Sequence, residues 1–119
     1  FTNTKIRNEL VKSVLLNLNN PKILKEDLKA GAEFALSESN KNIKEHPYDI
    51  RYYLASAILY RMAHRFDLTY LDKAEDLMKR AERISPKRPE IQEELIELAR
   101  LKSLYQKQQE TLSSLEKKG

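Results

Sequence analysis

The four prolines of this chain divide it into segments that each carry the apolar spacing of an α-helix. Proline lacks a backbone N–H and disfavours the helical conformation in the residue before it, so a helix ends just before a proline or begins with one. Between prolines 21, 47, 86 and 89, apolar residues recur at intervals of three and four, and no segment shows sustained alternation. The 119 residues suffice for one domain. The chain is therefore predicted to be all-α.

The first three of six predicted helices lie before residue 64. The first covers residues 4–19. Asn20 as N-cap and Pro21 as first helical residue are predicted to begin the second helix, which contains Gly31 and ends before Pro47. Asp49 is the predicted N-cap of the third helix, which runs to about residue 63.

The other three helices follow a polar joint at residues 64–69. Thr69, with Asp72 three residues later, resembles a capping box at the start of the fourth helix, which ends at Pro86. Pro89 begins the fifth helix. A weak joint near 102–104 is predicted to separate the fifth helix from a largely polar sixth helix that caps the C-terminal end.

An internal repeat organises these helices. Proline closes a helix at 47 and again at 86, a spacing of 39 residues. The first helix between them carries an aromatic residue, a small residue and a tyrosine, and the second carries two alanines and a bulky residue before the proline. These residues are Tyr53, Ser56, Ala57, Tyr60, Ala74, Met78 and Ala81.

This pattern resembles the tetratricopeptide repeat (TPR) family, whose standard unit has about 34 residues. The extra residues fall in the joint at 64–69, and the small residues at 57, 74 and 81 allow close approach of helices. The resemblance implies a right-handed superhelical stack of about six antiparallel helices. It divides a single domain, 1–119, into an N-terminal helix pair (1–46), the best-formed repeat (47–88) and a degraded or capping repeat (89–119).

Three departures from the repeat pattern are visible. Ser56 replaces a large aliphatic residue, and Asn42 stands where the pair before Pro47 should have its second alanine. After Pro86, Gln108 and Leu115 replace the two alanines. We therefore expect one well-formed repeat between two weaker ones.

A narrower resemblance covers about 45 residues, from Glu45 to Ile91. The runs EHPYD at 45–49, RYYL at 51–54, YLDKAE at 70–75 and ISPKRPEI at 84–91 look like the TPR tails of bacterial O-antigen ligase or polymerase-like membrane proteins. In such proteins the glycan chemistry belongs to the membrane-embedded part. The chain begins at Phe1 without a start methionine, so we expect a soluble domain tethered to a larger bacterial membrane protein, on a side of the membrane left open.

The composition excludes most kinds of catalytic chemistry. The absence of cysteine excludes disulfides, thiol catalysis and Cys-ligated metals, and two histidines and two glycines leave little for a metal site or a phosphate loop. No cofactor and no metal ion are expected. The net charge of +4 is mild in a chain with 34% charged residues, so no nucleic-acid partner is expected.

The TPR resemblance implies a concave peptide groove lined by the first helix of each pair. Leu54, Ile58 and Glu94 stand where chaperone-binding relatives hold a terminal carboxylate, so a carboxylate clamp is not expected. The glutamates could receive a basic peptide, pair with Arg51 and Arg61 across the groove, or simply form a solvated face near a helix N-terminus. The predicted groove residues are Arg51, Leu54, Ile58, Arg61, Met62, Glu90, Glu93, Glu94, Glu97 and Arg100.

A basic cluster closes the fourth predicted helix. It is either a favourable helix C-terminus or a contact for anionic lipid headgroups or acidic glycan. Its members are Lys79, Arg80, Arg83, Lys87 and Arg88.

The sequence thus predicts a non-catalytic protein–protein interaction or assembly module. The expected partner is a segment of another protein, bound in the groove or against an exposed terminal helix, or a second copy of the chain. The alternative is a regulatory or glycan-lipid-contacting appendage of its own membrane enzyme.

Overall fold

The computed structural model describes residues 2–118 and, within them, the side chains of residues 4–117. It contains α1 (Thr2–Asn17), α2 (Lys25–Glu45), α3 (Ile50–Met62), α4 (Thr69–Ile84) and α5 (Pro89–Lys118), and residues 2–118 form no strand. The all-α prediction is confirmed. The count of six helices is wrong, because the last two predicted helices are one.

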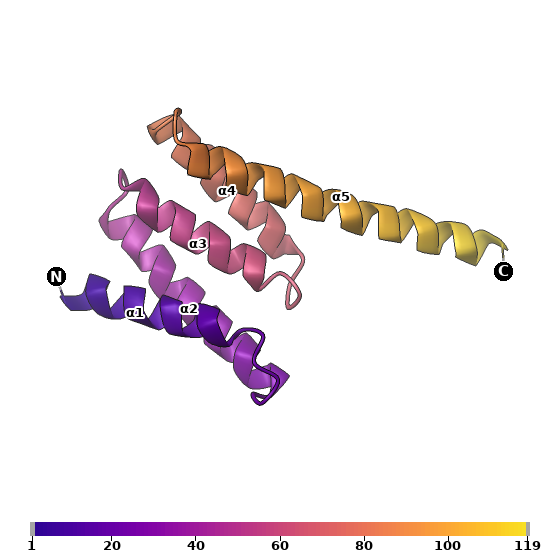
Figure 1. Ribbon diagram of the computed structural model, residues 1–119, viewed down its shortest axis with the longest axis horizontal. Coiled ribbons are helices and arrows are strands. Elements are labelled where there is room, and N and C mark those ends of the chain that lie inside the picture. The colour runs from indigo at the N-terminus through magenta and orange to yellow at the C-terminus, as the bar shows by residue number, and fades with distance from the viewer. Residues whose placement is uncertain (1, 119) are drawn as a thin grey trace.

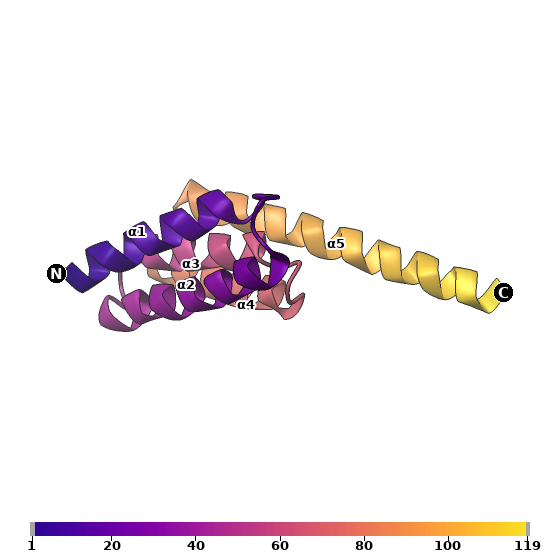
Figure 2. The same cartoon turned by 90° about the horizontal axis from the view of Figure 1, so that it is seen from below.

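The helices form two layers. Consecutive helices are antiparallel and pack against one another, and α3 also touches both α1 and α5. Figure 2 shows α1, α3 and α5 in one layer and α2 and α4 in the other. Helices α2 and α4 run in the same direction (Figure 1). They lie too far apart for their backbones to pack directly.

Small residues bring α3 and α4 together. Ala57, Ala74 and Ala81 are completely buried, as is Met78, which fills the space beside them. Tyr53 is 3% exposed, and its hydroxyl donates a hydrogen bond of 2.7 Å to the Pro47 carbonyl. The close approach of helices predicted at these alanines is therefore confirmed, and the polar end of the buried tyrosine is satisfied.

A second core joins α1 to α2 and α3. Val11 and Leu18 from the α1 segment pack with Ala35 and Leu36 of α2 and with Leu59 of α3, all of them buried. The first helix therefore folds back on the bundle.

The predicted start of α2 is wrong by four residues. Asn20 does not cap a helix that begins at Pro21. Instead its side-chain oxygen accepts a hydrogen bond of 3.0 Å from the Lys22 backbone N–H and closes a local turn, and α2 begins at Lys25. Asparagine satisfies a turn in this way as readily as it caps a helix.

The cap predicted for α3 is confirmed, and the cap predicted for α4 is wrong. Asp49 is the N-cap of α3 and accepts from the Arg51 N–H, as predicted. Thr69 is already inside α4, so the capping box with Asp72 is wrong. The N-cap position is Leu68, and Asp67 just before it accepts bonds from both the N–H and the hydroxyl of Thr69. These two bonds lower the pKa of Asp67.

Helix α5 is continuous through the predicted joint at 102–104. The sequence contains no glycine or proline between Pro89 and the last residue, Gly119, so nothing breaks the helix. Lys102 lies inside the supposed joint and ties α5 to α4, with its ammonium 2.5 Å from an Asp72 oxygen and 3.3 Å from a Glu75 oxygen. The C-terminal half of α5 projects beyond the other helices (Figure 1).

Candidate interaction surfaces

The predicted groove residues of α3 are only partly available to a partner, because they make contacts within the protein. The Arg51 guanidinium lies 2.6 Å from the carboxylate of its own N-cap, Asp49, and lowers the pKa of that carboxyl. Leu54 and Ile58 are half-buried, and Leu54 packs against the α3–α4–α5 core. Met62 is half-buried against the α1–α2–α3 core.

One predicted pairing across the groove is present. Arg61 on α3 donates a hydrogen bond of 2.6 Å to Glu94 on α5, and Glu94 is only 7% exposed. The other predicted pairing is not formed, since Arg51 pairs with Asp49. Glu94 is therefore a structural residue between two helices of one layer and is not accessible to a partner.

The remaining α5 residues of this set stay on the surface. Glu97 pairs with Arg100 at 2.5 Å, which lowers the pKa of Glu97 and raises that of Arg100. Glu90 lies 3.8 Å from Arg88, and Glu93 is exposed. The exposed face of α5 thus begins acidic.

Three members of the basic cluster have partners within the protein. Lys79 lies 3.3 Å from Glu75, the Arg80 guanidinium stands 5.4 Å from the centre of the Tyr53 ring, and Arg88 faces Glu90. Arg83 and Lys87 are exposed near the end of α4. These contacts fit the interpretation of the cluster as a favourable helix C-terminus.

Both histidines contact neighbouring helices. His64 shares a hydrogen bond of 2.8 Å with the Tyr105 hydroxyl and a second bond with the Arg61 carbonyl, so it joins the end of α3 to α5. His46 stacks at 5.1 Å on Tyr52. Among the described residues, no three His, Asp or Glu side chains are grouped as a metal ion requires.

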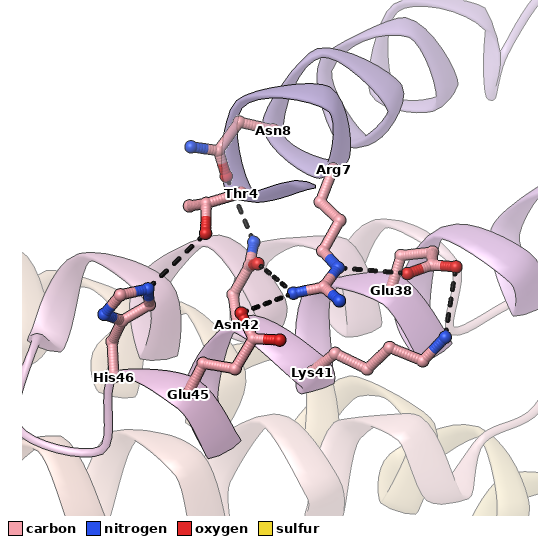
Figure 3. Close-up of polar contacts among 8 residues, drawn as sticks. All are labelled: Thr4, Arg7, Asn8, Glu38, Lys41, Asn42, Glu45 and His46. Atoms are coloured by element: carbon pink, nitrogen blue, oxygen red, sulfur yellow. Dashed lines mark hydrogen bonds and ion pairs between the residues drawn. The ribbon is translucent and has the colours of Figure 1, made fainter. Parts of the chain in front are cut away.

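A polar network that the sequence did not predict fastens α1 to α2 (Figure 3). Arg7 donates to Glu38 at 3.2 Å, to Asn42 at 3.3 Å and to Glu45 at 2.7 Å, and Asn42 in turn donates to Asn8. Asn42 is 1% exposed. The asparagine in place of a repeat alanine was the available signal: a buried amide needs polar partners, and α1 supplies them.

A cleft of about 830 Å³ opens between α2 and α4. Ile43, Leu77 and Tyr60 form its apolar floor, and charged side chains from both helices form its walls. The Tyr60 hydroxyl accepts a hydrogen bond of 2.9 Å from Asn40 at the edge of the cleft. Its volume falls within the range of ligand pockets, about 300–1,000 Å³. The charged wall residues are Lys41, Lys44, Asp72, Lys73, Asp76 and Arg80.

An apolar stripe follows α5 from the bundle into solvent. Its residues recur at alternating intervals of three and four, the heptad spacing of helices that pack side by side. Ile91 and Leu98 are completely buried, whereas Leu112 and Leu115 are each 60% exposed. The stripe comprises Ile91, Glu94, Leu98, Leu101, Tyr105, Gln108, Leu112 and Leu115.

No family model, curated protein or solved structure matches this chain. Within residues 2–118, no helix combines the length and the apolar character that crossing a membrane requires.

Proposed function

We propose that this chain is a non-catalytic protein–protein interaction module whose contact surface is the projecting half of α5. The observation that carries the proposal is the stripe on α5. Apart from Glu94, which pairs with Arg61, the stripe residues that α3 and α4 cover are apolar. The same spacing continues to Leu112 and Leu115, where the described residues offer no covering helix. An amphipathic helix gains stability when a partner covers its apolar face.

The expected partner contributes an amphipathic helix. Residues 106–118 extend about 20 Å at 1.5 Å per residue, enough for side-by-side packing over nearly two heptads. Gln108 in the middle of the stripe favours a partner with a polar side chain at that level, because a buried amide needs a hydrogen-bond partner. A second copy of the chain and another protein both meet these requirements.

We further propose that the stack is of the TPR type. Its support is the alternation of α1, α3 and α5 in one layer with α2 and α4 in the other, together with the three buried alanines between α3 and α4. The stripe on α5 is then the surface that a next helix of the stack would cover.

A site-specific photo-crosslinker tests the contact surface in cells that make the protein. Placed at Gln108, on the stripe, it should give a discrete adduct of higher mass. Placed at Glu110, which is two residues away on another face of α5, it should give little. Similar adducts from both positions would contradict the proposal.

A variant gives a second readout. Leu112→Glu with Leu115→Glu should abolish the adduct from position 108 while the helical circular dichroism persists, because both leucines are exposed. An adduct that survives this double change would reject α5 as the contact surface.

The parent that we propose is a bacterial membrane protein of the O-antigen ligase or polymerase type, for which this domain would be a regulatory or glycan-lipid-contacting appendage. Its support is the set of runs between Glu45 and Ile91, with exposed Arg83 and Lys87 as candidate contacts for anionic groups.

Binding to vesicles that contain anionic lipid should weaken with salt and with Arg83→Glu. Equal co-sedimentation of the variant would reject the membrane contact, and the sequence upstream of Phe1 tests the parent.

A further inference from the structure

We infer that the cleft between α2 and α4 binds a second copy of this chain. The part of the second copy that binds is the outward face of its α5, formed by Glu93, Ile96 and Arg100. The inference uses surfaces other than the exposed stripe, so it and the proposed function can fail separately.

One end of the cleft is cationic. Lys44 and Arg80 stand near the C-terminal ends of α2 and α4, and Lys41 lies one turn before Lys44. Because the two helices run in the same direction, their negative dipole ends meet there, and the cations offset them. Lys41 is also engaged by Glu38, and the Arg80 guanidinium lies over the Tyr53 ring, so Lys44 is the cation most available to an acidic partner.

The other end of the cleft is close to neutral. Asp72 and Asp76 stand there with Lys73, and Lys102 neutralises Asp72 at 2.5 Å. An occupant should therefore be acidic at one end, apolar in the middle and close to neutral at the other end.

The outward face of α5 has this order of residues. Ile96 is 68% exposed and supplies the apolar part of this face. Glu93 lies about one turn before Ile96, and Arg100 about one turn after it, both of them exposed. Arg100 is paired with Glu97 at 2.5 Å, so this face is acidic at Glu93, apolar at Ile96 and close to neutral at Arg100.

The length and direction of the outward face of α5 match those of the cleft. Glu93 to Arg100 spans about 10 Å of helix, and Asp72 to Arg80 along the cleft wall spans about 12 Å. Placing Glu93 at the cationic end and Ile96 over the apolar floor makes the incoming α5 antiparallel to α2 and α4, which also opposes the helix dipoles favourably. Charge complementarity and length therefore favour a second copy as the occupant.

The interface is heterologous, because the cleft and the outward face of α5 are different surfaces of one molecule. Each copy can give its α5 to one neighbour and receive the α5 of another. Head-to-tail oligomers whose size grows with concentration are the expected result.

Sedimentation velocity over a concentration series tests the inference with two variants. Ile96→Asp damages the outward face of α5, and Lys44→Glu damages the cleft. Each should weaken self-association by about tenfold or more, because each puts a negative charge against an apolar or acidic surface. Ser113→Asp on the projecting part of α5 and Lys29→Glu on α2 make the same charge changes outside these surfaces and should associate like the unaltered chain.

Mixing the two variants gives the sharpest result. The intact cleft of Ile96→Asp can bind the intact α5 of Lys44→Glu, and growth then stops because both remaining surfaces are damaged. A 1:1 dimer in the mixture is therefore expected. Any of three results would overturn the inference. The unaltered chain could stay monomeric, the two variants could associate like the unaltered chain, or the mixture could form no dimer. Loss of association only in Leu112→Glu/Leu115→Glu would also overturn the inference and would assign self-association to the stripe.

Discussion

The Nε atom of Arg61 on α3 lies 2.6 Å from the Oε2 atom of Glu94 on α5. Glu94 occupies the stripe of α5 between Ile91 and Leu98, and both of these neighbours are completely buried. The ion pair is therefore a polar contact within an otherwise apolar seam. It links α5 to α3 at one level of the seam.

Removing only one partner of this pair should destabilise the fold. Arg61→Met leaves the buried Glu94 carboxylate without its hydrogen-bond donor, which should lower the free energy of unfolding by about 1–3 kcal/mol. Arg61→Met together with Glu94→Leu removes both charges and should recover most of the loss. Urea unfolding followed by circular dichroism measures both values. A double variant no more stable than Arg61→Met would contradict a buried, coupled pair.

The Ser39 and Ser56 hydroxyls form a buried hydrogen bond of 2.6 Å between α2 and α3. Ser56→Ala should lower the free energy of unfolding by about 1–3 kcal/mol, because it leaves the Ser39 hydroxyl buried without a partner. Adding Ser39→Ala removes the unsatisfied group and should bring stability close to that of the unaltered chain. Thermal and urea unfolding of the two variants check this. Equal losses in the single and double variants would show that the bond itself, and not the unsatisfied group, carries the effect.

The sequence was sufficient to predict helices and their core where one helix pair contains the whole pattern of prolines and alanines. Proline boundaries and alanine spacing predicted α3, α4 and their core, because Ala57 and Ala74 need only each other's helices to be buried. Ser56, in contrast, departs from the repeat pattern for a reason on another helix, the hydroxyl of Ser39. Asn42 is a second case, since its partner Arg7 is 35 residues away.

The errors at helix ends have a local physical cause. A polar side chain before an apolar run can cap a helix or close a turn, and the sequence around Asn20 and Thr69 allows both. The predicted break in α5 at 102–104 is absent because no glycine or proline interrupts the helix there, and Lys102 holds that segment against α4. The sequence predicts an exposed terminal helix but not the residue at which α5 leaves the bundle, because exposure depends on where the neighbouring helices end.

Gly31 gives a stabilising prediction. It lies inside α2 without positive φ, and a Cβ atom at this position would have no neighbour within 4 Å. Gly31→Ala should therefore raise the free energy of unfolding by about 0.5–1 kcal/mol, because alanine loses less backbone entropy on folding. Thermal melting monitored by circular dichroism measures the gain. An unchanged or lower melting temperature would indicate that α2 is not continuous through residue 31.

The attachment of α1 to α2 should weaken as the pH becomes acidic. The hydrogen bond from Arg7 lowers the pKa of Glu45 below its ordinary value of 4.5. A carboxyl whose pKa is lower in the folded state stabilises the fold above its unfolded pKa, and this contribution is lost as the pH falls through the folded value. Amide hydrogen exchange of residues 8–17 should therefore accelerate relative to that of α3 as the pH falls below about 4.5.

A matched pair of variants isolates this effect. Glu45→Gln should accelerate the exchange of residues 8–17 at neutral pH and reduce its further response to acid, because the amide cannot titrate. Glu116→Gln makes the same change on the projecting end of α5 and should leave both quantities unaltered. If Glu45→Gln shows the same acid response as the unaltered chain, then the Arg7–Glu45 pair does not control the attachment of α1.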